Sequence, residues 1–151
     1  MSLSTPENKA RRDWLGCLAR APEGQAAKLL AATGLATEFE YLRPPEIGSV
    51  MLRGRMGGSG GPFNMGEMTV TRCSLKLASG EVGHGYVQGR RRDDAQAAAL
   101  IDGLMQTDMA TEIRHKVLDP LSTEEQSRRK ARAGKAAQTK VEFFTMVRGE
   151  D

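Results

Sequence analysis

Residues 67–89 read EMTVTRCSLKLASGEVGHGYVQG, and this stretch sets the fold class of the 151-residue chain. Apolar residues alternate with polar ones on both sides of the dipeptide Ser79-Gly80, which favours a tight turn. The pattern predicts two antiparallel strands, Glu67–Ala78 and Glu81–Gly89, joined as a hairpin.

The faces of this hairpin carry two further signals. In the first strand the apolar parity changes between Val70 and Cys73, which predicts a bulge or a change of covering element near Arg72. In the second strand Gly83 and Gly85 share one face. Because glycine removes the side chain from that face, another element is expected to pack very close to it.

Two shorter strands are expected upstream, at Glu38–Arg43 and Ser49–Met56. Pro44-Pro45 separates them, since proline cannot donate to a strand ladder. A glycine-rich loop, Gly57–Gly66, then leads into the hairpin. The expected sheet is therefore an antiparallel meander of about four strands.

The N-terminal part predicts an αα-hairpin. Thr5 is a suitable N-cap and Pro6 a suitable first helical residue. Apolar residues at helical spacing around Trp14 continue this helix to Ala21-Pro22. A second helix is expected from about Glu23 to Thr33, before Gly34.

Helical patterns return after the sheet. One helix is expected from Arg92 to Met105 and another over Met109–Leu118, ended by Asp119-Pro120. The capping-box sequence Ser122-Thr-Glu-Glu125 predicts a new helix that reaches about Lys140. Val141–Val147 is expected to be a short extended segment. Helices and strands are segregated along the chain, so we expect a single α+β domain over residues 1–151.

Composition indicates a lean core. Hydrophobic residues make up 39% of the chain and aromatic residues only 5%. Such a chain can fold, yet it is expected to need a partner over its apolar faces. Neither a membrane-spanning run nor an apolar signal segment is found, so a cytoplasmic protein is expected, with Cys17 and Cys73 as reduced thiols.

The glycine-rich loop and a neighbouring arginine are candidates for contact with an anion or a partner. Backbone donors and guanidinium groups are what a phosphate cradle needs, although no phosphate-loop or dinucleotide pattern is present. A plain hairpin connection is the preferred interpretation of these glycines, ahead of a ligand or partner contact. The candidate residues are Arg55, Gly57, Gly58, Gly60 and Arg90.

No catalytic or metal-binding cluster stands out. His84 and His115 are far apart in sequence and no ligand-spacing motif surrounds them. A nucleophilic pair of Cys73 with His84 is conceivable across the hairpin, but a core thiol is the preferred interpretation. We therefore assign no catalytic residue, metal or cofactor to this chain.

The segment 122–140 is basic, with six Lys or Arg residues against two Glu residues. A solvated helix face is the simplest interpretation of such a run, ahead of partner docking. A nucleic-acid-binding module is the third, because no aromatic residues interleave the charges and no recognised motif is present.

Several segments resemble the PhnG family of the carbon–phosphorus lyase system. They read RMGGSG at 55–60, GEMTVTR at 66–72, GYVQGR at 85–90, ALIDGLMQ at 99–106 and VEFFTMVRG at 141–149. Their order and spacing agree with the family over nearly the whole chain, and the last phrase is the most specific.

The resemblance implies a non-catalytic subunit in organic phosphonate catabolism. PhnG-like proteins assemble with PhnH, PhnI and PhnJ and work with the ATP-binding protein PhnL. Together with a PhnI-like nucleosidase they are expected to form alpha-D-ribose 1-methylphosphonate 5-triphosphate from ATP and methylphosphonate. ATP, S-adenosylmethionine and an iron–sulfur cluster are then expected on partner subunits and not on this chain.

Three readings of the function stay open at this point. The preferred one is a scaffold subunit that docks on PhnI, with Phe143, Phe144, Met146 and Arg148 as candidate interface residues, and a homodimer when isolated. The second is a stand-alone enzyme for phosphate esters or phosphonates that uses the Gly57–Gly61 loop and Arg90. The third is nucleic-acid binding by the basic helix.

Overall fold

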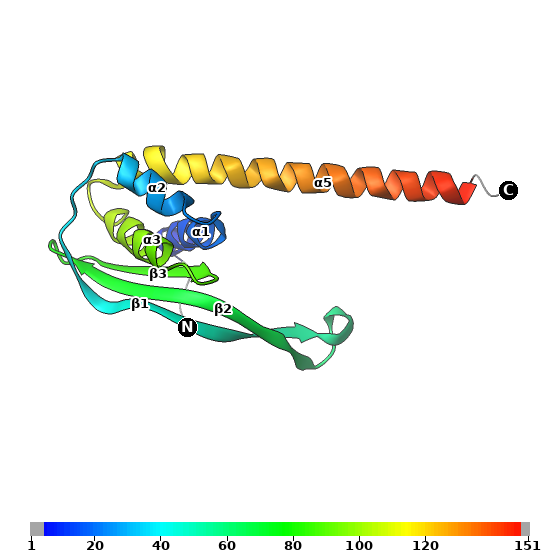
Figure 1. Ribbon diagram of the computed structural model, residues 1–151, viewed down its shortest axis with the longest axis horizontal. Coiled ribbons are helices and arrows are strands. Elements are labelled where there is room, and N and C mark those ends of the chain that lie inside the picture. The colour runs from blue at the N-terminus through cyan, green and yellow to red at the C-terminus, as the bar shows by residue number, and fades with distance from the viewer. Residues whose placement is uncertain (1–4, 149–151) are drawn as a thin grey trace.

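The computed structural model describes the backbone of residues 5–148 and the side chains of residues 5–138. It has an α+β fold, as expected: helices cover one face of a three-stranded antiparallel sheet with the order β1-β2-β3 (Figure 1). The elements are α1 (Pro6–Arg20), α2 (Gln25–Ala32), β1 (Phe39–Arg55), η1 (Met56–Gly58), β2 (Pro62–Leu77), β3 (Val82–Gln88), α3 (Arg92–Leu104), α4 (Ala110–Ile113), η2 (Arg114–Leu118) and α5 (Asp119–Arg148).

The N-terminal αα-hairpin is confirmed. The Oγ1 atom of Thr5 accepts a hydrogen bond from the backbone N–H of Asn8, which caps α1. Ala21 adopts an extended conformation ahead of Pro22 and ends the helix. Gly34 has a φ of +68° just after α2, a conformation that glycine adopts without strain.

The sheet has three strands where about four were expected, because the two short strands before the loop form one strand, β1. Register shifts lie between Tyr41 and Arg43 and between Arg43 and Glu46, around Pro44-Pro45. β1 is an edge strand, so the missing proline N–H groups disturb the ladder only locally. These bulges lie in β1 opposite Ser74 and Arg72, whereas the parity change predicted a bulge within the strand Glu67–Ala78 or a change of its covering element.

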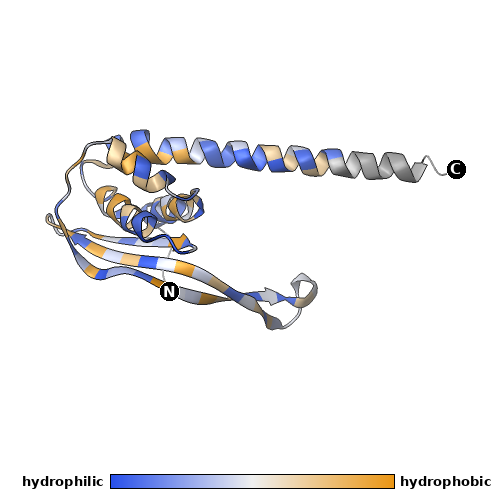
Figure 2. Ribbon diagram, viewed as in Figure 1, coloured by the Kyte–Doolittle hydropathy of each residue, from blue (hydrophilic) through white to orange (hydrophobic). Residues whose placement is uncertain are grey.

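β2 begins at Pro62, five residues before the expected start, so the glycine-rich loop is shorter than expected. Val70 and Thr71 are adjacent and both fully buried, which places the change of apolar face between them. The core lies between β2, β3 and α3 (Figure 2). Its main side chains are Leu18, Cys73, Leu75, Val87, Ile101, Ile113, Val117 and Leu121.

The glycine face of β3 meets α3, which confirms the predicted close approach. A Cβ atom added at Gly83 would lie 1.9 Å from the Ala99 carbonyl oxygen. A Cβ atom added at Gly85 would lie 2.0 Å from the Ala95 carbonyl oxygen. The helix backbone therefore rests directly on the strand.

The C-terminal helices differ from expectation in two ways. Asp119-Pro120 does not end a helix, because the π-helical turn η2 precedes α5 and the proline falls within the first turn of α5, where its missing N–H is tolerated. The predicted extended segment Val141–Val147 is wrong: α5 continues through it to Arg148. Residues before this segment are mostly good helix formers, and each added residue extends an existing helix by one hydrogen bond.

Candidate functional site

Two elements project from the body of the protein, and they form the candidate site. The first is the end of the β1–β2 hairpin, residues 49–69, which we call the arm (Figure 1). β3 pairs with β2 only between Val70 and Lys76, whereas β1 and β2 stay paired out to Arg55 and Pro62. Both outer edges of the arm are therefore unpaired in the described structure.

The tip of the arm explains three of the candidate glycines. Gly57 and Gly58 have φ values of +61° and +80° in the η1 turn. The Gly60 N–H donates to the Met56 carbonyl oxygen at 2.8 Å, and a Cβ atom at Gly60 would lie 2.7 Å from that oxygen. A tight turn alone accounts for these glycines, and a strand rather than a helix N-terminus follows them.

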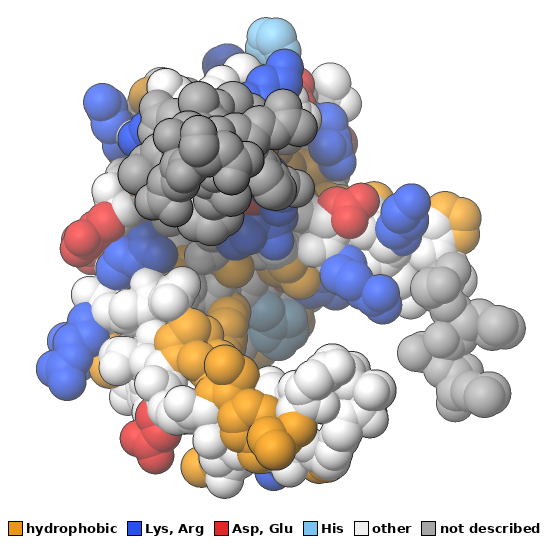
Figure 3. Space-filling model, turned by 90° about the vertical axis from the view of Figure 1, so that its right-hand side faces the viewer, with side chains coloured by type: hydrophobic (Ala, Val, Ile, Leu, Met, Phe, Trp, Pro, Cys, Tyr) orange, Lys and Arg blue, Asp and Glu red, His pale blue; other side chains and the backbone are white. Residues whose placement is uncertain are grey.

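The arm carries an apolar stripe along one strand parity. Leu52 and Phe63 lie on the same face as Gly54, and a Cβ atom on Gly54 would lie 2.5 Å from the sulfur of Met65. Phe63 is 43% exposed and Met65 is 65% exposed. Figure 3 shows hydrophobic side chains gathered along the arm. We define the apolar stripe as Val50, Leu52, Phe63, Met65 and Met68.

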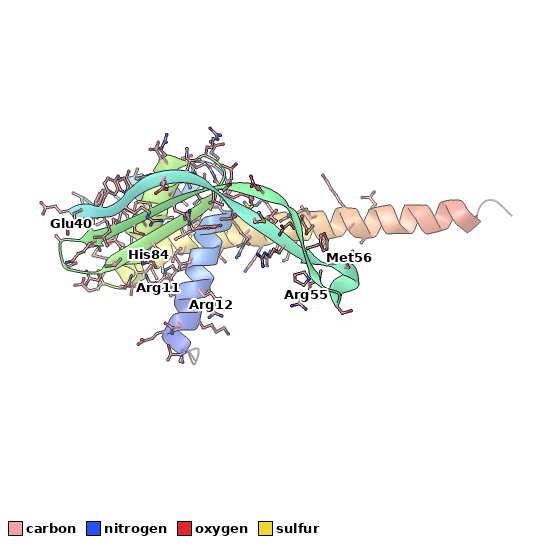
Figure 4. All side chains as sticks on the ribbon, turned by 90° about the horizontal axis from the view of Figure 1, so that it is seen from below. Arg11, Arg12, Glu40, Arg55, Met56 and His84 are labelled. Carbon is pink, nitrogen blue, oxygen red and sulfur yellow. The ribbon has the colours of Figure 1, made fainter. Side chains whose placement is uncertain are left out.

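Arg90 lies at a different place from Arg55. It lines a cavity of about 530 Å³ beside Ile47 and the start of α3. Arg55 is eight residues further along β1, which corresponds to about 25 Å at the strand rise of about 3.3 Å per residue. Figure 4 shows Arg55 and Met56 at the tip of the arm, away from His84 on the sheet. The five candidate anion contacts are thus not brought together.

The charged residues next to Arg90 in the chain form hydrogen bonds that stabilise the fold. The Arg91 side chain donates to the carbonyl oxygens of Ala21 and Gln88, and its Nη1 atom lies 3.4 Å from Asp94. Asp94 also accepts a hydrogen bond from the Gly24 N–H at 2.7 Å. Its carboxylate is buried at the start of α3.

Asp102 is the main polar residue that sequence reasoning missed. Its fully buried carboxylate accepts hydrogen bonds from Arg11 Nε and Nη2, from Trp14 Nε1 at 2.8 Å and from the His84 N–H at 2.9 Å. One side chain thus ties α1, α3 and β3 together. The available signal was an acid inside the small-residue stripe of α3, where a charge is tolerated only when paired.

Neither cysteine is set up as a nucleophile. Burial raises the pKa of the Cys73 thiol to about 11, and burial, followed by the charge of Glu125, also raises that of Cys17. Both thiols are therefore protonated at neutral pH. His84 does not pair with Cys73, because its ring Nδ1 lies 2.9 Å from the Ser74 hydroxyl on the opposite face of β2.

Within residues 5–138, no group of three or more His, Cys, Asp or Glu side chains is placed to hold a metal ion. In the same part of the chain no helix is both long and apolar enough to cross a membrane.

The second projecting element is α5. Its 30 residues extend for about 45 Å at 1.5 Å per residue. Leu121 is the one residue buried among those of α5 whose side chains are described. The candidate interface residues Phe143, Phe144, Met146 and Arg148 lie on the helical backbone, and their side chains fall outside the described residues.

Comparison with known proteins shows which family this chain resembles. The family described as phosphonate metabolism protein PhnG matches residues 9–149. The chain is also 39% identical, over 141 residues, to the alpha-D-ribose 1-methylphosphonate 5-triphosphate synthase subunit PhnG of Rhizobium meliloti strain 1021. This match covers 93% of the chain and 90% of the relative.

Proposed function

This chain belongs to the PhnG family, and we propose that it serves as a non-catalytic subunit of a complex that acts in phosphonate catabolism. The reaction of that complex is the formation of alpha-D-ribose 1-methylphosphonate 5-triphosphate from ATP and methylphosphonate. The Rhizobium relative is a subunit of alpha-D-ribose 1-methylphosphonate 5-triphosphate synthase, which supports this assignment.

The observation that carries the proposal is the amount of open surface. The chain exposes 10506 Å² of accessible surface. A compact monomer of 16.4 kDa exposes about 7,500 Å², because accessible surface scales with mass to the power 0.73. The excess of about 3,000 Å² on this one chain exceeds the roughly 1,000–2,500 Å² that each partner contributes to a permanent interface between subunits.

The arm and α5 are the two elements that leave the body (Figure 1). Burying an exposed Met or Phe side chain contributes about 1.5–3 kcal/mol, so the apolar stripe is a strong source of binding energy.

The partner that we propose for this surface is the PhnI-like subunit, within a core that also contains PhnH- and PhnJ-like subunits and works with a PhnL-like protein. In this assignment ATP, S-adenosylmethionine and the iron–sulfur cluster are bound by those subunits. A cytoplasmic location follows from the same assignment.

Co-expression with the PhnI-like subunit of the same organism tests the proposal. We expect a tagged chain to elute with that subunit from a sizing column. The variant Leu52→Ser/Phe63→Ser/Met65→Ser should lose the partner while it keeps its own thermal stability. Leu42→Ser, an exposed residue of β1 outside the arm, is the control and should keep the partner. Elution of the wild-type chain alone would reject the subunit assignment.

A further inference from the structure

A basic groove lies under the root of α5, where this helix leaves the body. The cavity measures about 770 Å³. It is lined by Arg20 from α1, Gln88 from β3, and Glu125, Arg128, Arg129, Ala131 and Arg132 from α5. Four arginines face a single carboxylate, so the lining has a net charge of +3.

The arginines keep most of their hydrogen-bonding capacity. Glu125 accepts from Arg20 Nε at 2.5 Å and from Arg129 Nη2 at 3.1 Å, and the hydrogen bond from Arg20 lowers the pKa of Glu125. Arg128 lies 4.0 Å from Glu124. Arg132 has no hydrogen bond or ion pair with the described residues. Each guanidinium offers five N–H donors, so many donors in the groove are free.

We propose that this groove binds an acidic segment of a partner subunit, whose carboxylates are held by Arg128, Arg129 and Arg132. Guanidinium groups bind carboxylates through two parallel hydrogen bonds, which gives orientation as well as attraction. This inference rests on the proposed function, because it requires that the chain be part of a complex.

A macromolecular segment fits the groove better than a small anion does. A polyphosphate would neutralise the arginines but leave the root of α5 uncovered, and residues 122–138 of this helix are all exposed or half-buried. A partner segment would both match the charge and support the helix. Figure 3 shows Lys and Arg side chains beside α5, above the hydrophobic arm.

The test uses two charge reversals on α5, measured in the complex with the PhnI-like subunit. Arg132→Glu removes a groove charge, whereas Lys130→Glu makes the same charge change two residues away, on another face of the helix. Neither variant removes a hydrogen bond or ion pair described within the chain. We expect Arg132→Glu to raise the dissociation constant about tenfold or more. Lys130→Glu should raise it less than about threefold.

Two further measurements test the groove: the dependence of the affinity on salt, and crosslinking from a photoreactive residue. The wild-type affinity should fall as ionic strength rises, because exposed ion pairs are screened. A photoreactive residue in place of Gln88 should crosslink to an acid-rich segment of the partner. Circular dichroism should show equal helix content in both variants.

The outcomes separate the two proposals. If the wild-type chain does not bind the partner, the proposed function fails and this inference fails with it. If the wild-type chain binds and the two variants bind equally well, only the groove inference is overturned. Tight binding of inorganic tripolyphosphate that Arg132→Glu abolishes, without an effect on the partner, would reassign the groove to a small anion and also overturn it.

Discussion

Replacement of Gly85 by alanine should destabilise the protein strongly, because α3 has no room to receive a side chain from β3. The added Cβ atom would lie 2.0 Å from the Ala95 carbonyl oxygen and 2.9 Å from the Ala99 nitrogen. Close carbon–oxygen contacts in proteins lie at about 3.3 Å, so the helix would have to move by about 1.3 Å. The neighbours are backbone atoms, and no rotamer change can relieve the overlap.

The magnitude follows from this displacement. Overpacking of a core costs about 1–3 kcal/mol, and rigid backbone neighbours place Gly85→Ala at about 3 kcal/mol. For a domain of this size that corresponds to a fall in Tm of about 6–12 °C, measurable by thermal unfolding followed by circular dichroism. Gly134→Ala is the matched control, because no atom lies within 4 Å of its added Cβ atom. Alanine is the better helix former by about 1 kcal/mol, so the control should lose no stability. A Tm for Gly85→Ala within about 2 °C of the wild type would refute the close packing of α3 on β3.

Three further predictions concern the buried acid, the buried thiol and the C-terminal helix. Asp102→Asn should lower the free energy of unfolding in urea by about 3 kcal/mol, because it breaks a buried ion pair with Arg11. Asp93→Asn, on the exposed side of α3, should leave that free energy unchanged. Equal urea midpoints for the two variants would contradict this. The pKa of Cys73 is raised in the folded state, so its contribution to stability should be complete below the unfolded value of 9.0 and be lost as pH rises to about 11. The free energy of unfolding of a Cys73→Ala variant should change less with pH over this range than that of the wild type. An identical pH dependence for the two proteins would count against the buried thiol. The isolated chain is expected to be a homodimer that becomes a monomer when residues 141–151 are removed, and light scattering that finds the full chain monomeric at high micromolar concentration would end this proposal.

The parts of the fold that could be predicted from the sequence are those governed by local chemistry. The Thr5 cap, the stop before Gly34 and the Ser79-Gly80 turn each depend on a few neighbouring residues, and all three are confirmed. The glycine face of β3 was equally informative, because glycines on one face of a strand indicate that another element packs close to that face.

The failures arise where tertiary context overrides a local signal. Pro44-Pro45 was expected to separate two strands, but an edge strand tolerates proline with a bulge. Pro120 was expected to stop a helix, but the π-helical turn before it absorbs the lost hydrogen bond. The apolar run Val141–Val147 favoured an extended segment, and helix propagation from residue 119 prevailed.

The candidate site was harder to predict than the fold. Arg55 and the loop glycines were recognised as a surface feature, but their grouping with Arg90 depended on a distance that sequence does not contain. The apolar stripe was missed because Phe63 and Met65 were assigned to a loop, and alternating apolar residues share a face only when they lie in a strand. The groove arginines did follow a visible rule, since residues 125, 128, 129 and 132 share one side of a helix.

The π-helical turn at the base of α5 gives the helix the mechanics of a lever. The described part of the body holds the base of this helix through buried Leu121 and through the hydrogen bonds that Glu124 and Glu125 accept from Gln25 and Arg20, while the far end at Arg148 is about 40 Å from Leu121. A tilt of about 10° at η2 would move that far end by about 8 Å. A change of angle at this one turn could therefore adjust the position of the far end of α5, so that this end binds a partner subunit after the body of the protein has docked.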